Sequence, residues 1–494
     1  FKYLWLDSIN YHYHDRYSTS SVEAEQLIYD NPSHPSFDLK QTMKLAKESG
    51  LEVIVLDWAL RQLSVSDIAL VNSDAASRQA IGLWLQTGDA MTVELIGSAI
   101  DESKFSADFS TYTYDGASVT GYASGQARVL NYVYQFESEE ALQEWVAIKM
   151  SAYAKEDNFR GVMLADEPSE ATFAQLAMVT KVIKKLYPNA YVQNSNLPCY
   201  GYQSGSGMFW DPYNDGYDDW SADDGAWKKL LQAHANAQSG ITETGINFYP
   251  FARWYHNPII GSDYYTYELR DHYLASLQFL ATTTRDADIN LEFTIQSYGV
   301  EKLYAEITKA KLDLQANLAL AFGTKTLGYF RYNTTDDGIE PGSANWAITQ
   351  TINTDDTLKS ATLYQNKNGN YLKAHMTFFE YQASKVFGTG TYMSTDGLEQ
   401  ATTLKKNIIT VPSGATVLVN EFYNEHTDQY GYYVVNLAAL NDNNGNNTSN
   451  ADVTITLSTG CQVYQDYTKY ASEKDSKVST VTLADGQGAF IVVE

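Results

Sequence analysis

Short apolar runs alternate with amphipathic segments along the first two thirds of the chain. Runs with strand-like length and composition occur eight times, at Tyr3–Leu6, Val53–Leu56, Val129–Tyr134, Gly161–Leu164, Ala190–Gln193, Gly245–Phe248, Leu291–Ile295 and Thr326–Phe330. Short apolar runs bounded by polar residues are typical of buried strands in parallel sheets. Helical patterns separate most of them, at Asp38–Glu48, Glu139–Lys155, Ala171–Leu186, Ala226–Gln238, Tyr264–Arg285 and Glu301–Phe322.

Eight strands alternating with helices predict an α/β fold, specifically a (β/α)8 TIM barrel. A further helical pattern at Tyr371–Val386 would close the barrel and lead out of it. The extra length is expected in loops at strand carboxyl ends, at residues 8–36, 199–223 and 333–370. Structureless loops of this length in a compact domain are usually functional. Residues 59–127 are too many for one helix and predict a small inserted subdomain.

The composition changes near residue 395. From there to Glu494 the sequence alternates and is rich in β-branched residues, which predicts several short strands and an antiparallel β-sandwich. The strands are expected at Ile408–Val411, Thr416–Val419, Tyr430–Asn436, Val453–Leu457, Gln462–Tyr464, Val478–Leu483 and Ala489–Val493. We therefore predict a catalytic barrel over residues 1–394 and a sandwich over residues 395–494.

Two adjacent acids follow the fourth predicted strand. The run Val162–Leu164 leads through Ala165 into Asp166 and Glu167, and Pro168 opens the next helix. Barrel enzymes keep their chemistry at the carboxyl ends of strands. Like-charge repulsion separates the pKa values of adjacent acids, and a protonated carboxyl beside an ionised one suits acetal cleavage. The alternative is that both acids only complement the dipole of the helix.

The composition limits the classes of molecule that the protein is expected to bind. The 494 residues carry a net charge of −26 with a pI near 4.6, which argues against nucleic acid and anionic membrane surfaces. No apolar run approaches the roughly 20 residues of a membrane span. The two cysteines, Cys199 and Cys461, suit a bacterial enzyme not built on disulfides. High acidity and abundant Tyr, Asn, Ser and Thr favour a secreted or cell-surface protein. The chain starts in a strand without an initiator Met, so we expect that a preceding segment was removed.

Aromatic residues supply a second indication of function. The chain has 38 Tyr, 19 Phe and nine Trp, many of them outside the predicted core. Sugar rings stack on aromatic faces while their hydroxyls need Asp, Asn, Gln and Tyr partners. Residues 209–220 mix aromatic rings with acids in this way, although an acidic Ca²⁺ loop is an alternative there. His12 and His14 resemble the His-x-His of metal-dependent barrel hydrolases, but Asn194 and Asn247 occupy the strand ends where that interpretation requires histidines.

Several motifs resemble those of the (β/α)8 glycoside hydrolases. A strand-four end reading Asp-Glu-Pro, Asn247-Phe248-Tyr249-Pro250 after strand six and Gln296-Ser297-Tyr298-Gly299 after strand seven carry the resemblance. Residues 318–332 look like the corresponding passage into strand eight of bacterial barrels related to β-galactosidase-type enzymes, and the C-terminal segment looks like their sandwich domain. The resemblance implies that Glu167 is the proton donor. The motifs do not assign one family.

The chain departs from the commonest pattern at strand seven. Retaining enzymes of the Asn-Glu-Pro type place a nucleophilic Glu there, and this chain has Gln296. A Gln cannot form a glycosyl ester. The nearest acid, Glu292, lies early in the strand. Adjacent Asp-Glu resembles the hexosaminidases that use the 2-acetamido group of the substrate as nucleophile, which implies that Asp166 would orient that group and that Asn247 or Tyr249 would bond its oxygen. A protein nucleophile and an inverting mechanism remain alternatives.

We therefore predict a glycoside hydrolase acting on an extracellular glycan, with a non-catalytic carbohydrate-binding barrel as the alternative. Glu167 and Asp166 are the predicted catalytic residues, and no metal or cofactor is expected. The sequence does not predict the oligomeric state. The predicted substrate-binding residues lie at strand ends and in the loops after them: Asp7, Asp57, Trp58, Tyr134, Asn194, Asn247, Tyr249, Gln296, Tyr298, Arg331 and Asp337.

Overall fold

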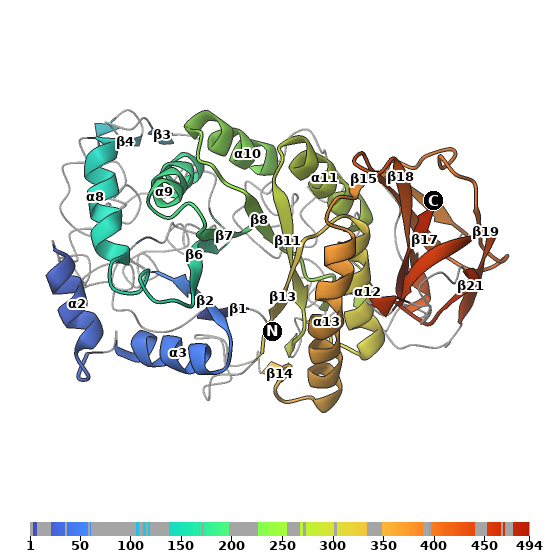
Figure 1. Ribbon diagram of the computed structural model, residues 1–494, viewed down its shortest axis with the longest axis horizontal. Coiled ribbons are helices and arrows are strands. Elements are labelled where there is room, and N and C mark those ends of the chain that lie inside the picture. The colour runs from blue at the N-terminus through green and yellow to red at the C-terminus, as the bar shows by residue number, and fades with distance from the viewer. Residues whose placement is uncertain are drawn as a thin grey trace, which may run out of the picture. The chain divides into compact units, whose positions relative to one another are not determined.

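The computed structural model divides into two compact units, which are described separately (Figure 1). The first unit comprises Phe1–Asp211 and Asp223–Ile246, and the second comprises Pro212–Ala222 and Asn247–Glu494. The structure describes residues 3–6, 21–34, 37–57, 60, 105–107, 112–114, 117–118, 138–166, 168, 172–196, 226–253, 267–269, 273–300, 304–332, 348–388, 395, 397–439, 452–465, 468–469 and 478–493.

A parallel sheet forms the centre of the first unit. Its strands follow the order β1-β2-β6-β7-β8, and each pairs with its neighbour in parallel. Their bounds are β1 Tyr3–Leu6, β2 Glu52–Leu56, β6 Phe159–Asp166, β7 Tyr191–Asn196 and β8 Glu243–Asn247. Parallel order along the chain requires crossover connections, and helices provide them.

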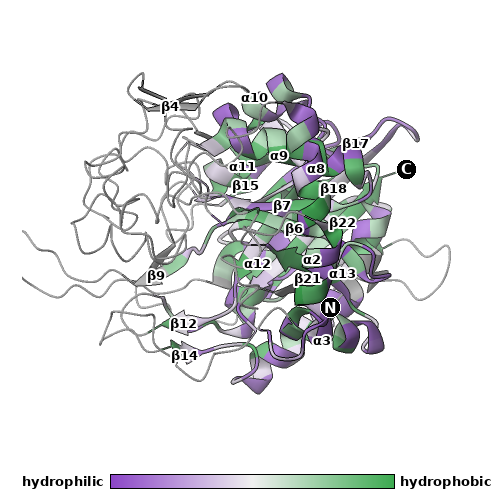
Figure 2. Ribbon diagram, turned by 90° about the vertical axis from the view of Figure 1, so that its left-hand side faces the viewer, coloured by the Kyte–Doolittle hydropathy of each residue, from purple (hydrophilic) through white to green (hydrophobic). Residues whose placement is uncertain are grey.

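Two helices of the first unit begin at serine caps. Ser21 caps α2 (Val22–Asp30) and Ser138 caps α8 (Glu139–Met150), each accepting a backbone N–H. A buried ion pair, Lys149 Nζ to Glu25 Oε1 at 3.1 Å, joins these two helices. The other helices are α3 (Phe37–Glu48), α9 (Phe173–Leu186) and α10 (Ala226–Ala237), and Figure 2 shows α10 as a mixture of hydrophilic and hydrophobic positions.

A small antiparallel sheet lies within the predicted insertion. It consists of β3 (Phe105–Ala107), β4 (Tyr112–Tyr114) and β5 (Ala117–Ser118), in that order. The rest of residues 59–127, apart from Leu60, falls outside the described residues.

The second unit contains two further parallel strands and the C-terminal sheet. Strands β11 (Asn290–Gln296) and β13 (Thr326–Phe330) pair in parallel. The helices are α11 (Tyr273–Asp286), α12 (Lys309–Ala321) and α13 (Asp356–His375). Two short antiparallel pairs accompany them: β9 (Phe251–Arg253) with β10 (Tyr267–Leu269), and β12 (Gly299–Val300) with β14 (Ile348–Gln350).

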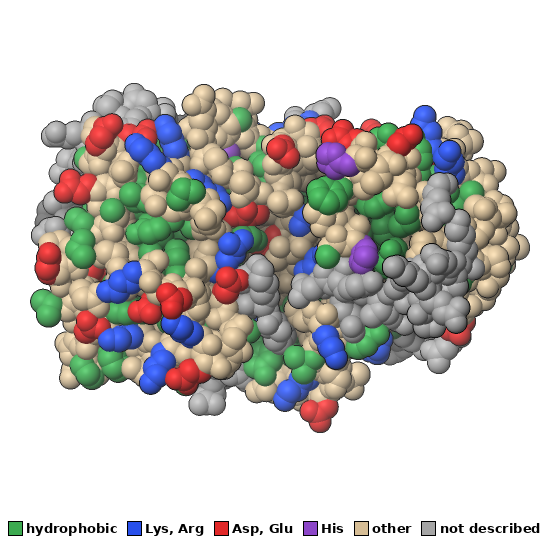
Figure 3. Space-filling model, viewed as in Figure 1, with side chains coloured by type: hydrophobic (Ala, Val, Ile, Leu, Met, Phe, Trp, Pro, Cys, Tyr) green, Lys and Arg blue, Asp and Glu red, His purple; other side chains and the backbone are tan. Residues whose placement is uncertain are grey.

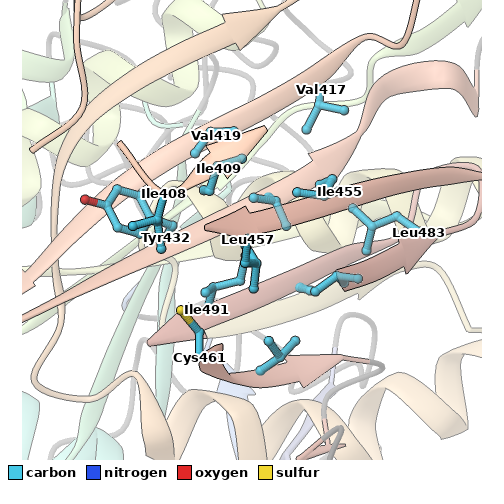
Figure 4. Close-up of a cluster of buried hydrophobic side chains, with 14 of the residues drawn as sticks. Ile408, Ile409, Val417, Val419, Tyr432, Ile455, Leu457, Cys461, Leu483 and Ile491 are labelled. Atoms are coloured by element: carbon cyan, nitrogen blue, oxygen red, sulfur yellow. The ribbon is translucent and has the colours of Figure 1, made fainter. Parts of the chain in front are cut away.

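The C-terminal strands form an antiparallel sheet in the order β15-β17-β18-β22-β19-β16, with β20 and β21 pairing β19. Long β19 pairs β22 near one end and β21 near the other, so it connects two layers. Alternate side chains of these layers fill one apolar core, which includes Val419, Ile455 and Ile491 (Figure 4). The bounds are β15 Glu380–Phe387, β16 Ile409–Thr410, β17 Val417–Asn424, β18 Gln429–Asn436, 3-10 helix η6 Leu437–Ala439, β19 Val453–Gln465, β20 Thr468–Lys469, β21 Val478–Leu483 and β22 Gly488–Val493.

Helix α12 is buried on all sides. Every residue from Lys311 to Ala321 is buried, because α12 contacts β11 on one side and β18 of the C-terminal sheet on another. Side chains also join α12 to other parts of the C-terminal sheet: Asn317 Nδ2 donates to the Gly486 carbonyl, just before β22, at 3.0 Å, and Asn420 Nδ2 of β17 donates to the Ala321 carbonyl at 2.8 Å. The buried polar residues of α12, such as Asn317 and Gln315, are accordingly hydrogen-bonded.

Seven of the eight predicted strands are confirmed as β1, β2, β6, β7, β8, β11 and β13. The predicted strand at Val129–Tyr134 lies outside the described residues. Parallel strands alternating with helices and a separate antiparallel sheet are thus established, while closure into an eight-stranded barrel and the boundary at residues 394 and 395 stay predictions. Among the described residues, no helix is both long and apolar enough to cross a membrane.

Some predicted elements are wrong. The pattern Tyr371–Val386 is not one helix, because α13 ends at His375 and residues from Glu380 pair with β17 as a strand. The predicted helix at Tyr264–Arg285 begins only at Tyr273, after β10. The helix predicted from Glu301 begins at Lys309, where Thr308 caps it.

Two predicted loops contain helices, since α2 lies within residues 8–36 and α13 begins within residues 333–370. Asp355 caps α13 by accepting from the N–H groups of Thr357 and Leu358. The mostly polar sequence of α13 hid its periodicity. The two strands expected at Val453–Leu457 and Gln462–Tyr464 are one continuous strand, β19.

Candidate functional site

Asp166 is the last residue of β6 and lies at the carboxyl edge of the parallel sheet of the first unit. Its neighbour on β7 is Ser195, and its side chain is partly buried. The register between β6 and β7 shifts between Met163 and Ala165, so one extra residue precedes the acid. Such irregularities re-aim side chains at strand ends. Glu167, the next residue, lies outside the described residues.

Close packing of β6 on β7 depends on Gly161. A Cβ atom at this position would lie 1.8 Å from the carbonyl oxygen of Tyr191. Only glycine allows the two backbones to approach this closely. The position of Asp166, five residues further along the same strand, therefore depends on a glycine that the sequence analysis did not single out.

Asp57 follows β2 and is fully buried. Its Oδ2 atom accepts a hydrogen bond from the Tyr153 hydroxyl at 2.6 Å. Side chains alternate across a strand, and Ile54 and Leu56 point the other way, into a cluster with Met163. Asp57 thus joins β2 to the turn after α8, and its predicted role toward a substrate stays a prediction.

The carboxyl end of β7 is rich in buried amides. Asn196 Nδ2 donates to Thr244 Oγ1 at 3.0 Å and to the Gly245 carbonyl at 2.7 Å, which fastens β7 to β8. Asn194 is also fully buried, and neither its Oδ1 nor its Nδ2 has a hydrogen-bond partner among the described residues. Buried amides of this kind are costly unless something completes their bonding.

The second unit contains an aromatic cluster made of Tyr249, Tyr298, Tyr304 and Phe330. The Tyr249 ring stacks on Phe330 with centres 6.0 Å apart and an interplanar angle of 21°. Tyr298 meets Phe330 edge-on at 5.1 Å and Tyr304 at 5.1 Å. Tyr249 and Phe330 remain partly exposed, while Tyr298 and Tyr304 are buried. The buried rings of Tyr298 and Tyr304 therefore support the partly exposed rings of Tyr249 and Phe330.

Arg331 adds a cation to this cluster. Its guanidinium carbon lies 5.9 Å from the centre of the Phe330 ring, and the side chain is partly exposed. Aromatic faces beside a guanidinium suit a polyhydroxylated ligand, since the rings take C–H faces and the guanidinium donates to oxygens.

Gln296, the last residue of β11, has both ends of its amide engaged. Its Oε1 accepts from the Phe251 N–H at 3.0 Å. Its Nε2 faces the carbonyl oxygens of Phe251 at 3.4 Å, Ala305 at 3.4 Å and Tyr298 at 3.5 Å. The residue is fully buried. All these partners are backbone groups of the segments that carry the aromatic cluster.

Glu292 lies at the other end of the same strand and is 1 % exposed. Burial raises the pKa of its carboxyl to about 8, although Lys373 acts in the opposite direction. The group is thus neutral over much of the ordinary pH range. As expected from the sequence, it is remote from the carboxyl end of β11.

The structure brings together some predicted residues. Tyr249 and Tyr298 are in ring contact, and Arg331 adjoins the same cluster. Asn247 ends β8 and is 9 % exposed. Tyr304 and Phe330 were missed, although Phe330 ends a predicted strand and so carried the same positional signal as the residues chosen. The predicted residues outside the described part of the chain are Asp7, Trp58, Tyr134, Glu167 and Asp337.

Charges are interspersed on the face shown in Figure 3, where described Lys and Arg side chains lie among Asp and Glu. Within the described ranges, no group of three or more His, Cys, Asp or Glu residues could hold a metal ion. His12, His14 and residues 209–220 lie outside those ranges, so the metal alternatives for them remain open.

No protein-family model matches the chain, and no curated protein matches it. Solved structures resembling it include a glycoside hydrolase family 5 protein from Bacteroides vulgatus, with 11 % identity, 93 % of this chain and 86 % of that chain covered, and a TM-score of 0.36. A β-galactosidase from Marinomonas ef1 has 9 % identity, 76 % and 56 % coverage, and a TM-score of 0.38. An endo-1,4-β-mannanase from Eisenia fetida has 10 % identity, 69 % and 74 % coverage, and a TM-score of 0.31. These scores are low, so the function proposed below rests on the residues of this chain.

Proposed function

We propose that the protein is a glycoside hydrolase acting on an extracellular glycan or oligosaccharide, with Glu167 as general acid and base. The observation that carries the proposal is the position of Asp166, partly buried at the carboxyl end of a parallel strand, with Glu167 next in the chain. Glu167 would protonate the leaving oxygen as the glycosidic C–O bond breaks, and would then deprotonate the attacking water.

The aromatic cluster of the second unit supports a carbohydrate ligand. Partly exposed faces of Tyr249 and Phe330, with Arg331 beside them, match the C–H faces and oxygens of a sugar ring. Nearby Asn247 is the proposed hydrogen-bond partner for a substrate oxygen. The bacterial origin and the secreted or cell-surface location belong to the same proposal.

Substrate assistance is the mechanism that we favour. The last residue of β11 is Gln296, so that strand supplies no carboxylate at its carboxyl end. In the assisted mechanism the 2-acetamido oxygen attacks the anomeric carbon as the glycosidic C–O bond breaks, and Glu167 gives its proton to the leaving oxygen. The product is an oxazolinium ion, and the Asp166 carboxylate accepts a hydrogen bond from its N–H and stabilises its positive charge. Water then opens the oxazolinium ring.

A non-catalytic carbohydrate-binding protein is the second candidate, and the amide at position 296 favours it. The two functions differ in the effect of one carboxyl group. Hydrolysis requires Glu167 as a proton donor, whereas stacking of a sugar on aromatic rings does not.

A panel of 4-nitrophenyl hexosides and N-acetylhexosaminides, assayed with wild type and Glu167→Gln, tests the proposal. For alkyl glycosides of the sugar that is cleaved, we expect Glu167→Gln to reduce turnover by ~10²–10⁴-fold, because poor leaving groups need protonation. Turnover of the 4-nitrophenyl substrates should fall much less, and binding of the free sugar should persist. Equal losses for both leaving groups would remove Glu167 from this role. Sugar binding without any hydrolysis by the wild type would favour the second candidate.

A further inference from the structure

We infer that Gln296 is a positioning residue that holds the aromatic cluster in its sugar-binding form, rather than a displaced nucleophile or a direct ligand of the sugar. The inference deepens the proposed function and rests on it as far as the sugar is concerned. Its structural part, that one amide fixes the segments carrying Tyr249, Tyr298 and Tyr304, stands on the hydrogen bonds alone.

The amide joins three separate segments of backbone. Phe251 begins the segment after Tyr249, Tyr298 follows β11, and Ala305 follows Tyr304. Gln296 accepts from the Phe251 N–H and lies within 3.5 Å of a carbonyl oxygen in each segment. The Ala305 N–H also donates to the Phe251 carbonyl at 2.9 Å, so the segments are connected to each other as well.

The amide is itself held in place by α12. Gln315 Oε1 accepts from the backbone N–H of Gln296 at 2.9 Å, and Gln315 Nε2 donates to its carbonyl at 3.0 Å. These two hydrogen bonds fix the backbone position from which the Gln296 side chain extends. Precise placement of binding groups requires this kind of support from neighbouring residues.

The chemistry of these partners explains why this position holds an amide and not an acid. Three carbonyl oxygens face Nε2, which is a donor, and one N–H faces Oε1, which is an acceptor. A carboxylate would place negative charge against those carbonyl oxygens in a buried position. A protonated carboxyl would fit, because it keeps one acceptor and one donor.

Gln296→Glu therefore converts the support into a pH-dependent one. Burial should raise the pKa of the new carboxyl well above the ordinary value of a glutamate side chain. Other titratable side chains on the contacting elements are Glu292 and Tyr298, Tyr304 and Glu306, Lys309, Lys311 and Asp313 of α12, and Tyr329 of β13. Lys311 Nζ lies 5.4 Å from the Phe251 ring centre. The wild type carries all of them, so comparison with it at each pH removes their contribution.

Gln278→Glu is the matched control. Gln278 is also a buried amide of the second unit, accepting from the Glu399 N–H at 2.7 Å and donating to the Glu399 carbonyl and the Tyr381 hydroxyl. The same chemical change there should disturb Tyr381 and leave the aromatic cluster intact.

Hydroxyl-radical footprinting of the full chain at pH 5 and pH 8, read by mass spectrometry, tests the positioning without any ligand. For Gln296→Glu at pH 8, we expect labelling of Tyr298 and Tyr304 to rise severalfold and to return to the wild-type level at pH 5. Gln278→Glu should leave labelling of both tyrosines unchanged. Labelling of Tyr298 and Tyr304 in Gln296→Glu that stays at the wild-type level at pH 8 would overturn the inference.

Kinetics with the best 4-nitrophenyl substrate of the panel tests the link to the sugar. Loss of one well-bonded buried group costs about 1–3 kcal/mol, so KM of Gln296→Glu should rise about tenfold or more at pH 8. The rise should vanish at pH 5, with kcat little changed. Trapping of an ester at position 296 by a 2-fluoro sugar would overturn the inference. If the wild type neither binds nor cleaves any sugar, the proposed function fails, while the footprinting still decides the role of Gln296.

Discussion

The Tyr433 hydroxyl donates a hydrogen bond to Asn317 Oδ1 at 2.9 Å, which links β18 of the C-terminal sheet to α12. Asn317 also donates to the Gly486 carbonyl at 3.0 Å. Both contacts are buried. The C-terminal sheet and the helix beneath it are therefore parts of one packed unit, and α12 would lose its cover if the sheet were removed.

Replacing Asn317 should destabilise the second unit. Asn317→Ala removes the buried hydrogen bonds to the Tyr433 hydroxyl and to the Gly486 carbonyl, and we expect a loss of about 2–5 kcal/mol in the free energy of unfolding. Tyr433→Phe should lose about 1 kcal/mol, and the double variant should lose less than the sum of the two. Urea unfolding followed by tryptophan fluorescence and circular dichroism measures these changes. Strict additivity would show that the two side chains do not interact.

Replacing Asp166 separates the mechanisms. If the acetamido group is the nucleophile, Asp166→Asn should lose activity and also affinity for a thiazoline that mimics the oxazoline. Calorimetric titration with the thiazoline measures the second effect. A covalent ester formed with a 2-fluoro sugar would instead point to a protein nucleophile, with Asp7, Asp57 and Asp337 as candidates. If neither reagent reacts, an inverting mechanism requires a second carboxylate ~6.5–9.5 Å from Glu167.

Glu292 should make stability depend on pH. Because burial raises the pKa of its carboxyl to about 8, the folded chain holds one more proton than the unfolded chain between the ordinary value of 4.5 and that raised pKa. Stability from this group is fully present below about pH 4.5 and is lost as pH rises toward 8. We expect the free energy of unfolding of Glu292→Gln, measured relative to the wild type, to increase by on the order of 1 kcal/mol per pH unit across that window.

Urea unfolding at pH 5, 6, 7 and 8 measures this difference. Glu425→Gln, at an exposed position, is the control, and its free energy of unfolding should change with pH in parallel with that of the wild type. Parallel lines for Glu292→Gln as well would show that its carboxyl titrates alike in the folded and unfolded chains.

Two glycine substitutions should act in opposite directions. Gly161→Ala would bring a Cβ to 1.8 Å from the Tyr191 carbonyl oxygen, so β6 must move away from β7, at a cost of about 3 kcal/mol, the upper end of what overpacking usually costs. Beyond the backbone of α13 itself, no atom of the described residues lies within 4 Å of the place that a Cβ at Gly369 would occupy, and Gly369→Ala should stabilise by about 0.5–1 kcal/mol. Thermal unfolding compares them, and the activity of Gly161→Ala should also fall because Asp166 lies on the displaced strand. A stable, active Gly161→Ala would show that the sheet adapts without moving the acid.

The local pattern of the sequence was enough to predict the parallel strands. Runs such as Val53–Leu56 and Val162–Ala165 are apolar on both faces and short, and this combination arises when helices cover a sheet. The same pattern placed Asp166 at a strand end, because the apolar run stops at Ala165. Predictions failed where a segment fitted two kinds of element, as at Glu380–Phe387, which has helical spacing and became a strand through pairing with β17.

By itself the sequence determined where most of the described parallel strands lie, and it placed their ends to within three residues, because burial of the strand and solvation of the turn leave a sharp change in polarity. It could not determine what each strand-end side chain meets. Asp57 and Gln296 both end predicted strands and both looked like sugar ligands. Only the tertiary structure decided that Tyr153 donates to the first and that three backbone segments converge on the second, since those partners lie 45 to 96 residues away or across a loop and reach it only when the chain is folded.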